Sequence, residues 1–101
     1  MLDMRVIARK ALMDFYSTHN DAEIALEDWY ARTSKAKWKD FSDLKRSFRS
    51  ADSVGNKRIV FNIKGNRYRL VAIVLFQIKR VYIRFVGTHD EYEGIKDIKS
   101  I

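Results

Sequence analysis

The hydrophobic positions of this chain follow a helical period in the first half and a strand-like period in the second. Apolar side chains recur at three- and four-residue spacing over residues 9–18, which predicts a helix. The spacing continues over residues 20–34, where Asn20 followed by Glu23 matches a capping box at the start of a second helix. A short third helix is expected over residues 42–49, with its basic side chains outward.

Beyond residue 57 apolar and polar positions alternate, as they do in strands that bury one face. This alternation predicts strands over residues 58–63, 67–76 and 80–86. Gly65 and Asn66 are expected to connect the first two strands, because both residue types tolerate the positive φ that a two-residue hairpin loop requires.

Two shorter elements complete the predicted order. Residues 4–7 are a candidate first strand, and Thr88 is expected to cap one helical turn that ends at Gly94. Helices therefore precede a meander of strands, which predicts an α+β fold in which two or three N-terminal helices pack on an antiparallel β-sheet. The length of 101 residues suits one domain over residues 1–101.

The composition excludes several classes of site. The chain has no cysteine, so disulfides, thiolate metal sites and a cysteine nucleophile are excluded, and an intracellular protein is expected. No apolar N-terminal run resembles a signal peptide, and the longest apolar stretch, residues 70–76, is too short to cross a membrane. We therefore expect a cytoplasmic protein without a membrane partner, a metal site or a cofactor.

The net charge of +7 indicates an anionic partner, and nucleic acid is the commonest one. The charge is unevenly distributed along the chain. Residues 35–86 include fourteen basic and three acidic residues, a net charge of +11, whereas residues 1–34 and 87–101 each have a net charge of −2. The middle of the chain is thus the candidate nucleic-acid interface, and a basic surface that only favours solubility is the alternative.

Two stretches of the second half form a more specific pattern. Residues 60–71 read VFNIKGNRYRLV and residues 86–92 read VGTHDEY. In order and spacing they resemble the strand–turn–strand and the VGTHxEY signature of HigB toxins, and the similarity extends over about residues 38–94. Lys64 departs from this pattern, since many members of the family have a small or uncharged residue at that position.

The resemblance implies a toxin of a type II toxin–antitoxin system with a RelE-like microbial RNase fold. Toxins of this family enter the ribosomal A site and cut messenger RNA. The implied partners are therefore the ribosome, mRNA and a HigA-like helix-turn-helix antitoxin. A metal-independent endoribonuclease of this kind uses the ribose 2′-OH as its nucleophile.

Such a reaction needs groups that move protons and a group that stabilises the charge on phosphorus. Arg69 is the candidate phosphate clamp, because the guanidinium fork matches phosphate oxygens and stays charged. His89 is the first candidate for acid or base work, with Tyr92 three residues later on the same face of a helical turn. Lys64, across the hairpin, is a further catalytic candidate. Ordinary surface and core roles are the alternatives for each.

The candidate RNA-binding residues are basic side chains on and around the strands. Arg67 is expected to share a strand face with Arg69, and Arg84 interrupts the apolar alternation of the last strand, so it needs a partner or an open groove. Salt-sensitive contacts to the RNA backbone are expected from five further residues. These are Lys45, Arg46, Arg49, Lys57 and Arg58.

A non-catalytic basic module that binds RNA or DNA as a regulator is the competing hypothesis. It predicts that substitution of His89 leaves activity intact, while neutralisation of several basic residues abolishes it. The nuclease hypothesis predicts that a single change at Arg69 or His89 removes toxicity without unfolding the chain.

Overall fold

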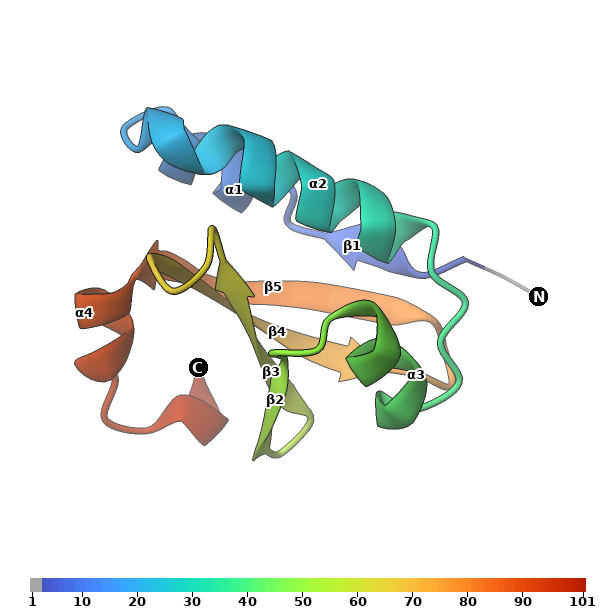
Figure 1. The fold of residues 1–101 in the computed structure, drawn as a ribbon. Helices are drawn as coiled ribbons and strands as arrows, with labels where there is room; N and C mark the ends of the chain where they lie inside the picture. Colours follow the sequence, from blue (N-terminus) through green and yellow to red (C-terminus); the bar gives the residue numbers. More distant parts are fainter. Residues whose placement is uncertain (1–2) are drawn as a thin grey trace.

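A five-stranded mixed sheet forms the centre of the protein (Figure 1). The computed structural model describes residues 3–101. The strands are β1 (Arg5–Ile7), β2 (Asp52–Gly55), β3 (Arg58–Ile63), β4 (Tyr68–Leu75) and β5 (Arg80–Thr88). They lie in the order β1-β5-β4-β3-β2, where β1 is parallel to β5 and every other neighbouring pair is antiparallel.

Helices lie on one face of this sheet and at its two ends. They are α1 (Lys10–Tyr16), α2 (Glu23–Ser34), α3 (Phe41–Ser47) and α4 (His89–Glu93), with short 3-10 turns η1 (Asn20–Ala22) and η2 (Ile98–Ser100). Helices α1 and α2 form a layer over the sheet, while α3 and α4 lie toward opposite ends of it (Figure 1). No helix among residues 3–101 is long and apolar enough to cross a membrane.

The face of the sheet beneath α1 and α2 holds the main hydrophobic core. Cross-strand register places Phe61 opposite Leu70, and Leu70 opposite Val86, on this helix-covered face. Trp29 of α2 packs edge-on against Phe61 at a ring-centroid distance of 5.3 Å. Because strand side chains alternate, the residues between these point to the other face, which α1 and α2 leave uncovered.

We call this side, which lacks α1 and α2, the open face, although Val60 and Val71 in its middle are buried. It is formed by the alternate residues Arg5, Ile7, Arg58, Val60, Asn62, Arg69, Val71, Ile73, Arg80, Tyr82, Phe85 and Gly87. The C-terminal segment runs beneath its middle (Figure 1). Arg58 fixes this segment in place by donating from Nη2 to the carbonyl oxygen of Ile101 at 2.6 Å, and Asn56 donates to the carbonyl of Lys99.

A bulge in β5 changes which residues share a face. Val71 pairs with Phe85 and Ala72 pairs with Ile83, so Arg84 has no residue opposite it. Arg84 was expected to need a partner or an open groove, and the bulge explains how it interrupts the apolar alternation of this strand. The extra residue bends the ladder and leaves Arg84 exposed, while Val86 returns to the core side.

The α+β prediction and most of the predicted elements are confirmed, but the sheet is not a pure antiparallel meander. Residues 5–7 pair in parallel with β5 at one edge, and the unpredicted β2 extends the other edge through β3. Both edge strands are short, and β2 includes an exposed Asp52 and a bulge, so its sequence lacks the alternation that marks a buried strand.

Two local predictions about turns are also wrong. The β3–β4 connection has four residues, and positive φ falls on Lys64 (52°) and Gly65 (66°) rather than on Asn66. Asn20 forms no side-chain cap, because residues 20–22 form the turn η1 before α2 begins. A side-chain cap is found on a different helix, α3, where Oδ1 of Asp40 accepts from the backbone N–H of Asp43 at 3.0 Å.

Candidate functional site

The open face ends in a cluster built around Arg69 and Tyr92. Arg69 lies on β4 between Asn62 of β3 and Gly87 of β5. The guanidinium carbon of Arg69 lies 5.8 Å from the centre of the Tyr92 ring, within cation–π range. The fold thus brings together two of the four catalytic candidates from separate elements, β4 and α4.

Asn66 orients the guanidinium of Arg69. Nη2 of Arg69 donates to the Asn66 side-chain oxygen at 2.5 Å, and Nη1 donates to the Asn66 carbonyl at 3.3 Å. The Nε group of Arg69 has no hydrogen-bond partner within residues 3–101. A guanidinium held by one edge, with further N–H groups free, is arranged to bind an anionic oxygen.

Helix α4 places His89 and Tyr92 through a complete capping box. Thr88 accepts from the backbone N–H of Glu91 at 3.1 Å, and the Glu91 side chain accepts from the Thr88 N–H at 2.7 Å. The predicted cap at Thr88 is confirmed. The backbone N–H of His89 also donates to the carbonyl of Arg67 at 3.1 Å, so the start of α4 is joined to the start of β4.

The imidazole of His89 is partly exposed and lies among carboxylates of its own helix. Its Nε2 lies 3.3 Å from Oε1 of Glu93, and its Nδ1 lies 3.9 Å from Oδ1 of Asp90. The side chain is 37% exposed, which leaves it accessible to a substrate. Within residues 3–101, no hydrogen bond, ion pair or ring stacking joins the His89 ring to Arg69 or Tyr92.

Phe85 and Gly87 shape the floor beneath Tyr92. The rings of Phe85 and Tyr92 are 6.5 Å apart, and the Phe85 ring folds over the backbone of Gly87. A Cβ atom at position 87 would lie 2.5 Å from Cζ of Phe85. Glycine is therefore required here because an aromatic side chain approaches the backbone closely.

Lys64 and Arg67 bind a carboxylate on the other side of the hairpin. Lys64 Nζ lies 3.3 Å and Arg67 Nη1 lies 2.6 Å from Oδ2 of Asp21, in η1. The hydroxyl of Tyr68 donates to Oδ1 of the same carboxylate. The expectation that Arg67 lies beside Arg69 on one strand face is wrong, since Arg67 belongs to the turn and its guanidinium reaches the helix layer.

These three donors shift the ionisation of the groups they join. The hydrogen bond from Tyr68, followed by that from Arg67, holds the pKa of Asp21 well below its usual range. The same contact raises the pKa of Tyr68, because its hydroxyl proton is held by a carboxylate. Asp21 therefore remains ionised and fastens the β3–β4 turn to the helix layer.

The remaining basic candidates are dispersed over the molecule. Lys45 donates to the carbonyl of Ala51 at 2.6 Å, and Arg46 pairs with Asp43 on α3. Helix α3 lies toward the far end of the sheet from α4 (Figure 1). Three candidates have exposed side chains with neither a hydrogen-bond nor a carboxylate partner within residues 3–101, and these are Arg49, Lys57 and Arg84. Arg58 is engaged with the C-terminal segment.

Three residues of the site were not identified from the sequence. Asn66 and Gly87 lie inside the two motifs, but their contacts with Arg69 and Phe85 depend on how the turn and strand fold. Asp21 is separated from its partners by more than forty positions. No group of three histidine, aspartate or glutamate side chains within residues 3–101 is arranged to hold a metal ion.

Comparison with known proteins gives one family. The model of the HigB toxin family, described as the RelE-like toxic component of a toxin–antitoxin system, matches residues 22–95. The chain is 39% identical over 95 residues to the mRNA interferase toxin HigB of Escherichia coli K12, covering 89% of this chain and 88% of that protein. The mRNA interferase HigB of Shigella flexneri matches to the same extent.

Proposed function

The chain belongs to the HigB family of RelE-like toxins, and from that premise we propose that it cuts messenger RNA on the ribosome by a metal-independent 2′-OH attack. The observation that carries this proposal is the pairing of Arg69 with Tyr92 at the end of the open face. A fixed cation and an aromatic ring, side by side and accessible, match the phosphate and base of one nucleotide.

The chemistry assigns Arg69 to the phosphate. The ribose 2′-oxygen attacks the adjacent phosphorus as its proton leaves, and the bond from phosphorus to the 5′-oxygen breaks as that oxygen gains a proton. The products are a 2′,3′-cyclic phosphate and a free 5′-hydroxyl. The free N–H groups of Arg69 stabilise the extra negative charge on the phosphorane oxygens, a contribution that requires no metal ion.

His89 and Tyr92 are assigned to protons and to the base. The partly exposed imidazole of His89 is within reach of solvent and is assigned the role of general acid or base, and the Tyr92 ring stacks on the nucleotide whose phosphate Arg69 binds. Lys64 acts indirectly in this proposal, because Asp21 holds both Lys64 and Arg67 at the turn that carries Asn66. The positive charge of Lys64 still contributes to the electrostatic potential that attracts the RNA.

A toxin of this family has an antitoxin as its partner. We propose a HigA-like helix-turn-helix antitoxin, and the ribosome as the second partner, in the cytoplasm. Exposed cations on α3, on the connection after it and on the β2–β3 turn, such as Arg46, Arg49 and Lys57, supply salt-sensitive contacts to ribosomal RNA.

The proposal is tested by induction of the wild-type chain and the variants Arg69→Ala and His89→Ala in growing bacteria, with 5′-ends of cellular mRNA mapped in parallel. We expect wild-type induction to arrest growth and to create new ends within translated regions. Both variants lose these ends at equal protein level, whereas Lys10→Ala on α1 retains them. Growth arrest without new ends, or arrest unchanged in both variants, would favour the non-catalytic binding module instead.

A further inference from the structure

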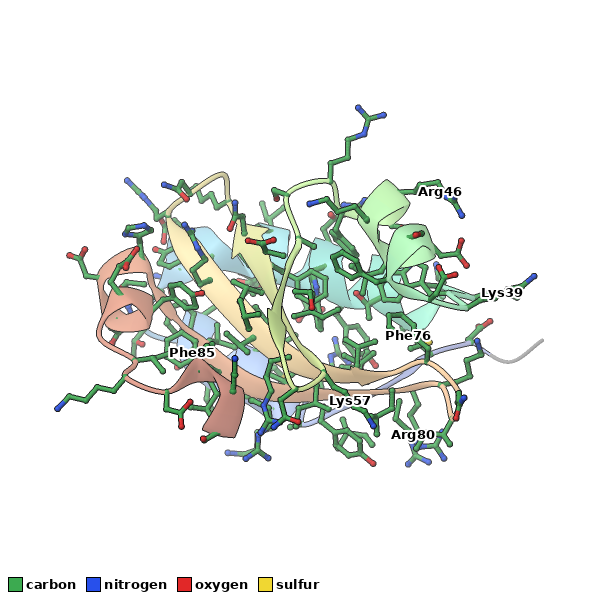
Figure 2. The ribbon with its side chains drawn as sticks, turned by 90° about the horizontal axis from the view of Figure 1, so that it is seen from below. Lys39, Arg46, Lys57, Phe76, Arg80 and Phe85 are labelled. Atoms are coloured by element: carbon green, nitrogen blue, oxygen red, sulfur yellow. The ribbon has the colours of Figure 1, made fainter. Side chains whose placement is uncertain are left out.

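A second basic surface lies on the open face, at the end away from Arg69. Arg5 of β1 and Arg80 of β5 are directly opposite each other in the parallel register, and Tyr82 follows opposite Ile7. Met4, Val6 and Val81 pack into the core, so Arg5, Arg80 and Tyr82 project from the open face. Figure 2 views this face and shows Arg80 and Phe85 at its opposite ends.

Arg84 joins this surface through the bulge of β5. Because no residue of β4 stands opposite it, its side chain is exposed rather than packed in the ladder. Arg80 and Arg84 are separated by about 13 Å along the strand, at about 3.3 Å per residue. We call Arg5, Arg80, Tyr82 and Arg84 the β5 strip.

In the part of the chain that the structure describes, the arginines of the β5 strip lack the carboxylate partners that four other arginines have, and Arg80 donates only to the backbone carbonyl of Ile78, at 3.0 Å. In the helices and the β3–β4 turn each of four arginines pairs with a carboxylate, and these pairs are Arg9–Glu27, Arg32–Asp28, Arg46–Asp43 and Arg67–Asp21. Within residues 3–101 no carboxylate pairs with Arg5, Arg80 or Arg84. Placing Arg5 directly opposite Arg80 is also unfavourable in the free protein, since like charges repel across strands.

Tyr82 also lacks the contacts expected of a tyrosine in the core. It is half-buried and is not among the residues that pack on the main core. Its hydroxyl has no hydrogen-bond partner within residues 3–101. An aromatic ring flanked by unpaired arginines on an exposed sheet is a platform on which an unstacked base can lie while its phosphates contact the cations.

We propose that the β5 strip binds single-stranded RNA, with Tyr82 stacking on a base and Arg5, Arg80 and Arg84 contacting phosphates. The inference rests on the proposed function, and it identifies a second contact on the substrate strand, remote from the cleaved bond. Gly87, opposite Arg69, is about 13 Å from Tyr82 along the sheet, since their partners on β4, Arg69 and Ile73, are four residues apart. An extended RNA strand of a few nucleotides is long enough to reach both places by passing over the C-terminal segment, which crosses the middle of the open face.

RNA fits this surface better than an acidic protein segment does. An acidic peptide would be bound by the arginines alone and would not need the ring. RNA uses both features at once, and it is the polymer that the neighbouring Arg69 site is proposed to cut. Binding of an acidic protein partner in place of RNA would contradict the inference.

The test measures binding of a fluorescent 12-nucleotide RNA with 2′-O-methyl groups, which cannot be cut by 2′-OH attack. Anisotropy titrations compare wild type with Arg5→Gln/Arg80→Gln, and the matched control Lys10→Gln/Lys35→Gln removes two exposed charges from the helix layer. With a slope of about 0.7 per single-strand phosphate contact, the strip variant should lose about 20-fold in affinity at 0.1 M salt. Its log–log salt slope should be shallower by about 1.4.

Stacking is separated from charge by variants of Tyr82. We expect Tyr82→Leu to weaken binding roughly ten-fold with an unchanged salt slope, and Tyr82→Phe to bind as wild type. Arg84→Gln should reduce the salt slope by about half as much as the double arginine variant does. If Tyr82 has only a structural role, Tyr82→Leu should lower the melting temperature but should not weaken RNA binding at an unchanged salt slope.

Three results would overturn the inference. The first is strip variants that bind RNA within two-fold of their control, and the second is a wild type that does not bind the oligonucleotide at 0.05 M salt. The third is a double arginine variant that keeps RNA affinity but loses an acidic protein partner. Cleavage of translated mRNA is scored separately, so that a wild type that binds through the strip but cuts nothing contradicts the proposed function and not the β5 strip.

Discussion

At the scale of single residues, the orientation of Arg69 decides what the site can do. An arginine at the end of a strand samples many rotamers, and ordering it has an entropic cost that its contacts must offset. Asn66 removes much of this freedom through two hydrogen bonds from the same guanidinium. The remaining N–H groups are therefore arranged before substrate binds, which is the condition for stabilising charge that develops only during the reaction.

Substitution of Arg69 should affect the rate far more than the fold. We expect Arg69→Ala to reduce cleavage by about 100-fold or more, the usual loss when one preorganised donor to a charged transition state is removed. Arg69→Lys keeps the charge but loses the planar fork, so most of the loss should remain. Single-turnover cleavage in a translation reaction measures this, with melting temperature as control. Full activity in Arg69→Lys would mean that Arg69 supplies charge without orientation.

The lowered pKa of Asp21 predicts a pH-dependent contribution to stability. A carboxyl group whose pKa is lower in the folded chain stabilises it fully above the unfolded value, about 3.9, and loses this contribution as pH falls toward the folded value. Wild type should therefore be more stable than Asp21→Asn at pH 7 and pH 5, and the difference should shrink below pH 4.

Urea unfolding at pH 7, 5 and 3 measures this difference directly. Asp14→Asn, an exposed carboxylate paired only with Lys10, is the control and should show little effect at any pH. A difference between wild type and Asp21→Asn that is the same at pH 7 and pH 3 would show that the carboxylate charge is not what fastens the turn.

The sequence marked candidate residues for the site but gave little indication of their contacts. Arg69, His89 and Tyr92 were identified because residue type and family pattern mark them locally. The pairing of Asp21 with Lys64 and Arg67 was not predictable, since η1 and the β3–β4 turn meet only when the helix layer packs on the sheet. The turn itself was misread because positive φ at Lys64 carries no compositional signal.

At the scale of elements, α4 depends on its cap more than on its length. It has five residues, too few for a helix to persist alone. The reciprocal bonds between Thr88 and Glu91, together with the bond from His89 to the Arg67 carbonyl, fix its first turn on the end of the sheet. The positions of His89 and Tyr92 therefore follow from a cap that the sequence displays.

Removal of this cap should loosen the site. We expect Thr88→Val to lose about 1 kcal/mol of stability, a typical cost of removing an N-cap side chain. Thr88→Ser keeps the hydroxyl and should behave as wild type. Amide hydrogen exchange of residues 91–93 reports the local effect, and cleavage rate reports the functional one. Unchanged exchange in Thr88→Val would show that packing, rather than the cap, holds α4.

Gly87 is the position in β5 where packing against Phe85 is tightest. Gly87→Ala places a methyl group 2.5 Å from the Phe85 ring, so that ring must move and Tyr92 loses its support. Overpacking of this kind typically costs 1–3 kcal/mol. The double variant Gly87→Ala/Phe85→Leu should recover part of this loss, measured by a double-mutant cycle in urea. If the two changes have additive effects on the free energy of unfolding, the proposed tight contact between Phe85 and position 87 is contradicted.

Edge strands account for most of the errors at the scale of elements. The buried strands β3 and β4 have clear alternation or apolar runs, and residues 58–63 were predicted with their observed bounds. Strand β2 escaped prediction because it is stabilised by pairing with β3 rather than by burial of its own side chains. The bulge at Arg84 switches which alternate residues of β5 face the core. A two-residue period in the sequence cannot reveal such an inserted residue.

At the scale of the whole molecule, charge is divided between the two sides of the sheet. Many cations of the helix layer and the β3–β4 turn are paired with carboxylates, whereas Arg69 and the β5 strip on the open face are not. The net charge of +7 indicated an anionic partner but not this division. Strand alternation directs these arginines away from the core, so part of the basic composition gathers on the open face while other cations stay dispersed over the molecule.

The most direct test of the central claim is the chemistry of the RNA ends produced in a purified translation reaction. Fragments made with wild type and with Arg69→Ala would be isolated and their termini determined. The account predicts 5′-hydroxyl and 2′,3′-cyclic phosphate ends with wild type, and almost no fragments with Arg69→Ala. Fragments with 5′-phosphates, or equal cleavage by both proteins, would contradict 2′-OH attack at a phosphate held by Arg69.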